Sequence, residues 1–306
     1  MRVRLLGTAA GGGVPQWNCN CAVCREARAG TGRVRPRTQS SAAVSANGRH
    51  WFLLNASPDL RWQIENFPPL QPSARKTRDS PIQAVLLTNA DLDHTLGLLL
   101  LREGERLVVH APVNVQRSLT DGLSLAPTLD AFCGVQWVSP RENITPLLCR
   151  DQFESGLLYE TLPLPGQPPR FMKGTTVPSP INVVGYRITD AKTGDRLLFL
   201  PDVASLDDRL VCRLPECEAL LFDGTFWSEG ELQACGIGGL PASGMGHVPI
   251  SGPGGSLKVI AQLRVTHKIY THVNNTNPIL FEDSPERAAV NAAGCVVGMD
   301  GMEITI

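Results

Sequence analysis

The stretch "AVLLTNADLDHTLGL", residues 84–98, decides how the fold of this chain is read. It begins with an apolar run that lacks polar alternation, which is typical of a strand covered on both faces. Two carboxylates and a histidine, Asp91, Asp93 and His94, then follow within four positions. Polar chemistry directly after a buried strand predicts a functional site at the end of that strand.

Polar side chains also end other apolar runs. Asp202 follows "LLFL", and His272 follows "KIYT". Carboxylate oxygens and imidazole nitrogens are ligands of Zn²⁺, Fe²⁺ and Mn²⁺. Helix capping or a turn would explain each Asp singly, because Asp is a good N-cap residue. The joint occurrence of these residues at strand ends favours a metal site.

The order of the predicted elements indicates the fold class. Strands in two series, with helices between them, predict a layered α/β domain. Residues 40–57 predict a β-hairpin with a type I′ turn at Asn47-Gly48. A helix is predicted from its N-cap at Ser284 to Gly294 just beyond its end.

The composition excludes some classes of partner. The chain has 306 residues, 42% of them hydrophobic, and a formal net charge of -1. This is enough for a substantial core, and it gives no basic field to hold nucleic acid. No apolar run approaches the ~18 residues of a membrane span. We therefore expect a cytoplasmic chain that neither spans a membrane nor binds nucleic acid.

The stretch "WNCNCAVC" predicts a second metal site. Cys19, Cys21 and Cys24 form a C-x-C-x2-C pattern. Disulfides are improbable in the cytoplasm, and three thiolates this close repel one another unless they are protonated or metallated. The pattern predicts a structural Zn²⁺ in a loop at about residues 15–30, with a fourth ligand supplied from elsewhere in the fold.

The order of these motifs resembles the metallo-β-lactamase superfamily. Its members carry a T-H-x-H-x-D-H motif after a strand, a further His, an Asp after a later strand and a last His. Here the order is Thr88 with Asp93-His94, then "FLPD", then "TH". The resemblance implies an αββα sandwich, one domain over residues 1–306, and an active metal at an edge of the sheets.

Departures from the family motif imply one active metal ion. Asn89 and Asp91 stand where the motif has its first two histidines, and "LPLPGQ", residues 162–167, has no histidine where a third is expected. The resemblance therefore leaves ligands for a single ion, which are Asp93, His94, Asp202 and His272. Asp91 is expected to assist catalysis beside that ion, either by reaching it or by orienting a ligand.

Three further stretches narrow the resemblance. Together with the cysteines, "DGTFW", "MGHVPI" and "THVNNTNP" are similar to the B proteins of pyrroloquinoline quinone (PQQ) biosynthesis, relatives of the phosphodiesterase branch. That likeness implies that Asn275 is a weak fourth zinc ligand through its amide oxygen. His247 is expected to be catalytic, donating or accepting a proton near the active metal.

The function that this resemblance implies is a step in PQQ biosynthesis. The chain would be an Fe²⁺-dependent hydroxylase that uses O₂ on a tyrosine-derived, crosslinked Glu-Tyr precursor, with Zn²⁺ at the cysteines. Two alternatives stay open: a carrier of PQQ or its precursor toward the periplasm, and a zinc-dependent hydrolase. Other proteins of PQQ biosynthesis and a second copy of the chain, as a homodimer, are further expected partners.

Overall fold

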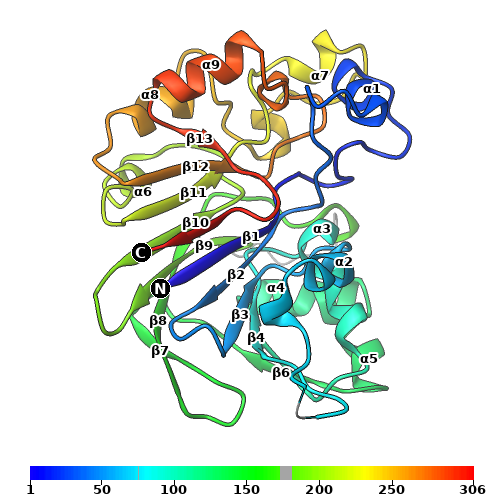
Figure 1. Cartoon of the computed structure of the whole chain (residues 1–306), viewed down its shortest axis with the longest axis vertical. Coiled ribbons are helices and arrows are strands. Elements are labelled where there is room, and N and C mark those ends of the chain that lie inside the picture. Colours follow the sequence, from blue (N-terminus) through cyan, green and yellow to red (C-terminus); the bar gives the residue numbers. More distant parts are fainter. Residues whose placement is uncertain (75, 173–180) are drawn as a thin grey trace. The chain divides into compact units, whose positions relative to one another are not determined.

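The backbone of the chain is divided between two units. The computed structural model describes residues 1–74, 76–172 and 181–306 (Figure 1). The first unit consists of residues 1–7, 40–196 and 301–306, and the second of residues 8–39 and 197–300. Each unit is therefore assembled from stretches that lie far apart in the sequence.

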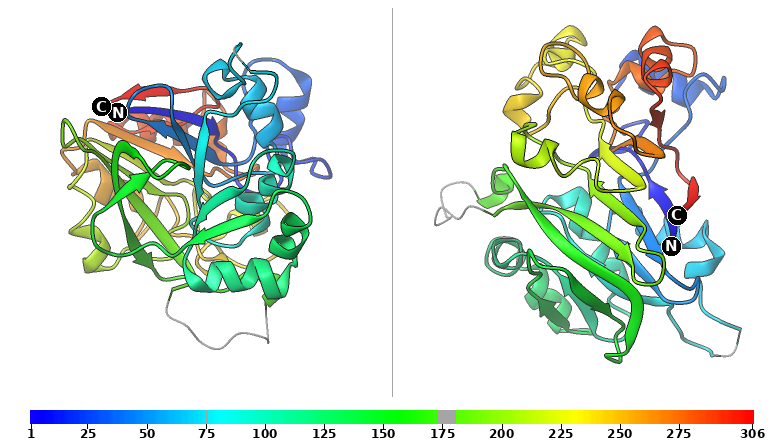
Figure 2. Two further views of the ribbon diagram at one scale, coloured as in Figure 1. Left: turned by 90° about the horizontal axis from the view of Figure 1, so that it is seen from below. Right: turned by 90° about the vertical axis from the view of Figure 1, so that its left-hand side faces the viewer.

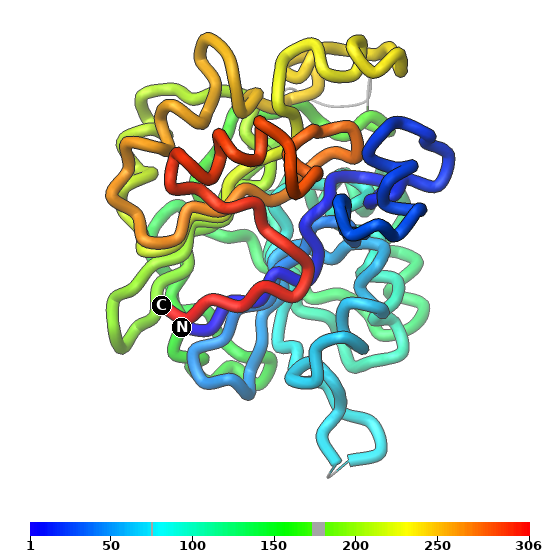
Figure 3. The backbone as a smooth tube through the Cα atoms, turned by 45° about the horizontal axis from the view of Figure 1, so that its top comes forward, coloured from blue at the N-terminus to red at the C-terminus, as the bar shows by residue number. Residues whose placement is uncertain are grey.

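The first unit is built on a mixed seven-stranded sheet. In spatial order its strands are β14 (Glu303–Thr305), β1 (Arg2–Gly7), β2 (Ser41–Ser45), β3 (Trp51–Leu54), β4 (Ile82–Leu86), β5 (Leu107–His110) and β6 (Val135–Val138). Pairing is antiparallel from β14 to β3 and parallel from β3 to β6. The two ends of the chain lie side by side (Figure 3), because Ile306 N donates to Met1 O at 2.9 Å.

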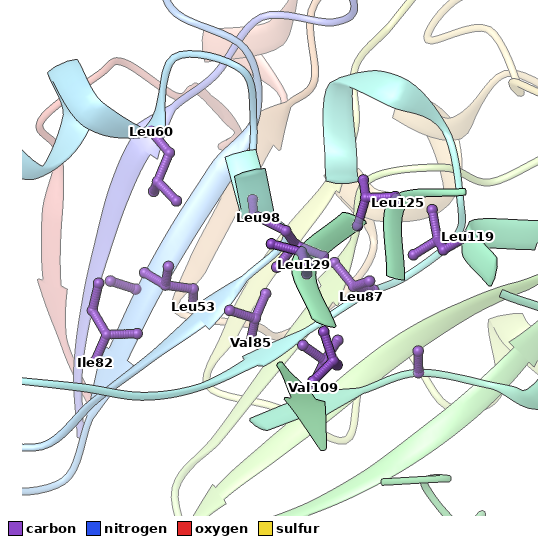
Figure 4. Close-up of a cluster of buried hydrophobic side chains, with 14 of the residues drawn as sticks. Leu53, Leu60, Ile82, Val85, Leu87, Leu98, Val109, Leu119, Leu125 and Leu129 are labelled. Carbon is purple, nitrogen blue, oxygen red and sulfur yellow. The ribbon is translucent and has the colours of Figure 1, made fainter. Parts of the chain in front are cut away.

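Helices and an apolar core cover one face of this sheet. The helices are α2 (Leu60–Glu65), α3 (Leu92–Thr95), α4 (Val113–Arg117) and α5 (Leu125–Asp130), with 3₁₀ turns at Pro68–Leu70, Leu96–Leu101 and Arg170–Met172 and a π turn at Ser118–Gly122. Val85 and Val109 of the sheet pack with Leu98, Leu125 and Leu129 of the helical layer (Figure 4). Each fully buried side chain of this kind stabilises the fold by about 1.5–3 kcal/mol.

Antiparallel strands pack on the other face of the sheet. They are β7 (Thr145–Leu148), β8 (Glu154–Leu164) and β9 (Val183–Asp190), and the long β8–β9 pair can be followed in the right-hand view of Figure 2. Tyr186 of β9 donates its hydroxyl to Leu87 O at 2.9 Å, and Tyr159 of β8 lies 2.8 Å from Nδ1 of His110. His110 points away from the helices because side chains alternate along a strand and Val109 faces them.

Gly97 permits a close approach within the stretch that follows β4. Its N–H donates to Ala56 O at 2.9 Å. A Cβ at this position would lie 2.3 Å from Ser57 O, which is far inside van der Waals contact. Only glycine therefore lets the turn after α3 pack against the segment that follows β3.

The second unit contains a parallel sheet. Its strands are β10 (Arg196–Leu200), β11 (Ala219–Asp223), β12 (His267–Thr271) and β13 (Val296–Val297), in that spatial order. Its helices are α1 (Ala22–Ala29), α6 (Asp208–Val211), α7 (Glu231–Ala234), α8 (Ser256–Ala261) and α9 (Pro285–Ala292), with 3₁₀ turns at Ser243–Met245 and Pro278–Leu280. Figure 1 shows α8 and α9 alongside β12 and β13. Among the described residues, no helix has the length and apolar character that a membrane span needs.

Local signals in the sequence are confirmed for α9 but only partly for the hairpin. Ser284 Oγ accepts from the N–H of the third helical residue, and Gly294 has φ +68° just after the helix. The antiparallel β2–β3 pair is confirmed. The type I′ turn is wrong, because only Gly48 has a positive φ. Asn47 Oδ1 instead accepts from the N–H groups of Arg49 and His50, which closes a longer loop.

The buried His110 makes the stability of the first unit depend on pH. Burial lowers its pKa to about 4, so between about 4 and 6.5 the unfolded chain binds a proton that the folded chain does not. Stability is therefore lost as the pH falls through this window. We expect the free energy of unfolding, measured with urea, to fall by about 1.4 kcal/mol from pH 7.5 to 5.5 on account of this residue.

The control for this prediction is His110→Asn, which keeps a polar atom near Tyr159 without a titrating group. The variant is expected to be less stable at every pH but to lack this part of the pH dependence. Equal losses in both proteins over the same pH range would contradict the assignment.

Candidate metal centres

Three polar side chains meet at the carboxyl edge of the parallel sheet in the second unit. Asp202 follows β10 and His272 follows β12, and Oδ1 of the first lies 3.8 Å from Nε2 of the second. His247, from the loop after β11, stacks on His272 with ring centroids 5.5 Å apart and planes at 29°. One ligand atom from each of the three lies within 4.8 Å of the other two. This spacing suits side chains that converge on a cation.

Asp223, the last residue of β11, orients this group. It is fully buried. Its Oδ2 accepts from Nδ1 of His247 and from the N–H of Val203, each at 2.8 Å. Its Oδ1 accepts from the hydroxyl of Thr225 at 2.6 Å. Burial acts to raise the pKa of Asp223, but the neighbouring histidines and these hydrogen bonds hold it below its usual value. The carboxylate therefore stays charged and acts as an acceptor only.

Thr225 extends this orientation to His272. With its proton donated to Asp223, the Thr225 hydroxyl oxygen can accept from Nδ1 of His272, 2.8 Å away. A histidine whose Nδ1–H is held in this way presents a bare Nε2. His272 is 4% exposed and has φ +57°, a left-handed conformation that costs a non-glycine residue about 1 kcal/mol or more. Surrounding contacts must therefore hold its backbone in place.

Asp93 and His94 form a second group, which lies in the first unit. His94 is 1% exposed, and its Nδ1 contacts Asn55 Nδ2 and lies 3.1 Å from Thr88 Oγ1. Its Nε2 lies 3.5 Å from Oδ2 of Asp93. The Nε2 atom of the imidazole and an oxygen of the carboxylate therefore lie side by side.

Asn89 and Asp91 shape the turn that precedes this pair. Asn89 Oδ1 accepts from the N–H of Asp91 at 3.0 Å, and Asp91 occupies the N-cap position of α3. The carbonyl of Asp91 accepts from the N–H of His94 at 3.0 Å and from the hydroxyl of Thr95 at 2.9 Å. The two residues that replace motif histidines thus build the backbone that presents His94.

The three cysteines of the second unit form a compact cluster. Cys19, Cys21 and Cys24 hold their Sγ atoms within 4.8 Å of one another. Cys21 is the N-cap of α1, and its sulfur accepts from the N–H of Cys24 at 3.5 Å. Burial, above all, raises the pKa of Cys21 to about 12. Although burial opposes it, hydrogen bonds from the other cluster residues lower the pKa of Cys19. A thiophilic cation can replace the remaining protons, as structural zinc does.

Asn275 lies against this cluster. It is 5% exposed, its Nδ2 is 3.2 Å from Cys24 Sγ, and its backbone oxygen is 3.3 Å from Cys21 Sγ. The expected role of Asn275 as a fourth ligand through Oδ1 requires a half-turn of this carboxamide, and it stays a prediction. The structure nonetheless brings together all four residues expected at the zinc site.

The sequence indicates Asp223 as a polar residue at a strand end, but the side chains that orient the histidines could not be predicted in that role. Thr225 and Asp223 contact the pair in the second unit, and Asn55 and Thr88 contact His94. A signal was present, because Asp223 and Asn55 each follow an apolar run, as the expected ligands do. Their partners could not be assigned, because these contacts form only when distant segments meet.

Comparison with known proteins identifies the family of the chain. The model of the "Beta-lactamase superfamily domain" matches residues 50–273. "Coenzyme PQQ synthesis protein B" of Ectopseudomonas mendocina is 42% identical over the full length of both chains. The protein of the same name from Cupriavidus necator is 41% identical, with 99% of each chain covered.

Solved structures show the same fold. The crystal structure of Zn(2+)-bound PqqB from Methylobacterium extorquens is 39% identical, covers all of both chains, and superposes with a TM-score of 0.90. A diphosphatase of the PhnP family, 20% identical, covers 99% of this chain and 97% of its own, with a TM-score of 0.68. The predicted αββα metallo-β-lactamase fold is confirmed. The chain belongs to the coenzyme PQQ synthesis protein B family, within the β-lactamase superfamily.

Proposed function

We propose that the chain acts in PQQ biosynthesis as a metal-dependent hydroxylase of a tyrosine-derived Glu-Tyr precursor. The observation that carries this proposal is the convergence of Asp202, His247 and His272. The buried carboxylate of Asp223 holds His247 directly and His272 through Thr225. Membership of the PQQ synthesis protein B family supports the pathway, and the donor set supports the metal. The hydroxylation step, and the use of Fe²⁺ and O₂ in it, go beyond family membership and are our own proposal.

The residues present fit a divalent cation. Imidazole nitrogens and carboxylate oxygens together suit Fe²⁺, as in iron sites built from two histidines and a carboxylate. We propose Asp202 and His272 as ligands. Asp93 and His94 are proposed for the same ion because of their order in the family motif. When bound, Fe²⁺ supplies a redox centre with open positions for O₂ and substrate.

Two other residues are proposed to transfer a proton and to position a metal ligand. Asp223 accepts the Nδ1–H of His247, so the Nε2 of His247 is left to take up or deliver a proton at the substrate. Asp91 holds the turn before His94 through its carbonyl. We therefore propose His247 as the proton-transfer residue and Asp91 as a residue that assists catalysis by positioning.

A zinc-dependent hydrolase is the second candidate, and it is favoured by the observation that the PqqB structure from Methylobacterium extorquens is Zn(2+)-bound. The two candidates are separated by loading the protein anaerobically with Fe²⁺ or with Zn²⁺ and adding precursor. After O₂ and a two-electron reductant such as ascorbate are admitted, the proposal expects O₂ consumption and a hydroxylated product with Fe²⁺ but not with Zn²⁺, because one oxygen atom enters the ring and the reductant converts the other to water. Hydrolysis of the precursor with Zn²⁺ would support a hydrolase. Tight binding of precursor or PQQ without turnover under either metal would support a carrier.

Removal of one proposed ligand tests the active centre. His272→Ala is expected to abolish Fe²⁺-dependent turnover, because it removes a nitrogen that Thr225 orients toward Asp202. The cysteine-bound zinc should remain, as counted by elemental analysis. Asn89→Ala serves as the control and should change the affinity for Fe²⁺ much less. A His272 variant with normal Fe²⁺ binding and full activity would refute the ligand assignment.

The orienting role of Asp223 gives a separate prediction. Asp223→Asn replaces one acceptor oxygen with an NH₂ donor. It therefore loses either the hydrogen bond from Thr225 or those from His247 and Val203. We expect the affinity for Fe²⁺, measured by chelator competition, to fall by about 10–100-fold. The exposed Asp208→Asn is the matched control. Unchanged affinity in the Asp223 variant would show that the carboxylate does not position the histidines.

The cysteine cluster is expected to hold one tightly bound zinc. X-ray absorption of the purified protein should show sulfur ligands, and the ion should survive mild chelation. Cys21→Ser removes the central sulfur of the cluster and should release the zinc. Cys212→Ser, which replaces an exposed cysteine outside the cluster, should not. Wild-type protein without a sulfur-bound metal would rule out this assignment.

A further inference from the structure

The two metal centres of the second unit share one short segment of chain. Residues 272–277 begin with the proposed ligand His272 and continue into a tight turn, in which the N–H of Asn277 donates to the carbonyl of Asn274 at 3.0 Å. Asn275 is the second residue of this turn, and it contacts two of the three cysteine sulfurs. The residue that contacts the cysteine cluster, Asn275, thus lies only three positions after the proposed ligand His272.

Hydrogen bonds make this segment rigid. The turn is buried: Asn275 is 5%, Thr276 4% and Asn277 0% exposed. The hydroxyl of Thr276 donates to the buried Glu231, and Nδ2 of Asn277 donates to Gly224 O at 3.0 Å. Tightly packed groups do not deform independently of one another. A displacement of Asn275 therefore moves the whole turn.

A second route leads from the turn to the imidazole of His272. The N–H of Asn274 donates to the carbonyl of Thr225 at 3.0 Å. The hydroxyl of the same threonine lies 2.8 Å from Nδ1 of His272 and 2.9 Å from its carbonyl oxygen. The position of the ring thus depends on the turn both through the backbone and through Thr225.

The backbone of His272 needs such external support. Its φ of +57° is unfavourable for a residue with a Cβ, and such conformations persist only where their surroundings fix them. On its other side, Val273 pairs with the loop after β1, since its N–H donates to Thr8 O and its carbonyl accepts from Ala10 N, at 2.9 and 3.0 Å. The Asn275 turn supports this backbone from the C-terminal side, and the cysteine sulfurs contact that turn.

We infer that Asn275 is a positioning residue that couples the two centres: a metal ion at the cysteine cluster fixes the turn and thereby raises the affinity of the His272 centre for its own ion. The inference rests on the proposed function in that it requires a metal ion at His272. Coupling of this kind is reciprocal, so an ion at His272 also tightens binding at the cysteines. The metal at the cysteines would then hold the His272 ligand in position in addition to stabilising the N-terminal loop.

Cobalt titration tests this coupling without an activity assay. Zn²⁺ is first placed at the cysteine cluster, and Co²⁺ is then titrated into the second site and followed by its visible spectrum. Sulfur-to-cobalt charge-transfer bands report any Co²⁺ that enters the cysteine cluster instead. We expect Asn275→Ala to retain zinc through its three cysteines but to bind this Co²⁺ about 10–100-fold more weakly than the wild type. Asn291→Ala, which replaces an exposed asparagine on α9, should match the wild type.

Cys21→Ser provides the second arm, because it leaves Asn275 in place but empties the cluster. It should weaken Co²⁺ binding at His272 to a similar degree, with circular dichroism used to verify that each variant is folded. Wild-type affinity in a folded Asn275→Ala variant overturns the inference, whatever the cysteine variant does. If the wild type binds no ion beyond the cysteine site, the proposed function fails, and the coupling fails with it.

Discussion

The hydrogen bonds of one buried carboxylate organise the second unit. Asp223 has two oxygens, and each accepts from two different groups: His247 and Val203 on one, and the N–H and hydroxyl of Thr225 on the other. A charged group with no exposure is costly unless it is fully hydrogen-bonded, and these contacts offset that cost. Because its donors come from the loops after β10 and β11, the carboxylate also fixes how the strand ends lie with respect to one another.

In the first unit, close packing fixes the strand ends that carry the polar side chains. The turn after α3 lies directly on the segment after β3, which the absence of a side chain at Gly97 permits. Asn55, in that segment, then contacts both Thr88 and His94. Strand β4 is buried between the helices and the β8–β9 pair. The polar residues that follow it, Asp91, Asp93 and His94, are therefore attached to a well-packed strand. Both units therefore present histidines from the ends of strands, each with Nδ1 already engaged.

Much of this could be predicted from sequence because the signals are local. Apolar runs that end in Asp or His mark the strand ends, three closely spaced cysteines mark the cluster for which a metal is predicted, and Ser284 with Gly294 marks the limits of α9. Interactions over long range could not be predicted. Thr225 meets His272 across 47 residues and Asn55 meets His94 across 39, and no pattern within either segment specifies its partner. The type I′ turn failed for a local reason, because the Asn47 side chain competes for the backbone donors of the loop.

The contact between Cys21 and Asn275 spans 254 residues. During synthesis on a ribosome the three thiols emerge long before the turn that packs against them has been made. Until then Asn275 cannot shield the thiols, whose soft sulfur atoms are suitable ligands for Cu⁺ and for Zn²⁺. The surroundings in which Asn275 meets the thiols are therefore completed late, after most of the 306 residues have been synthesised.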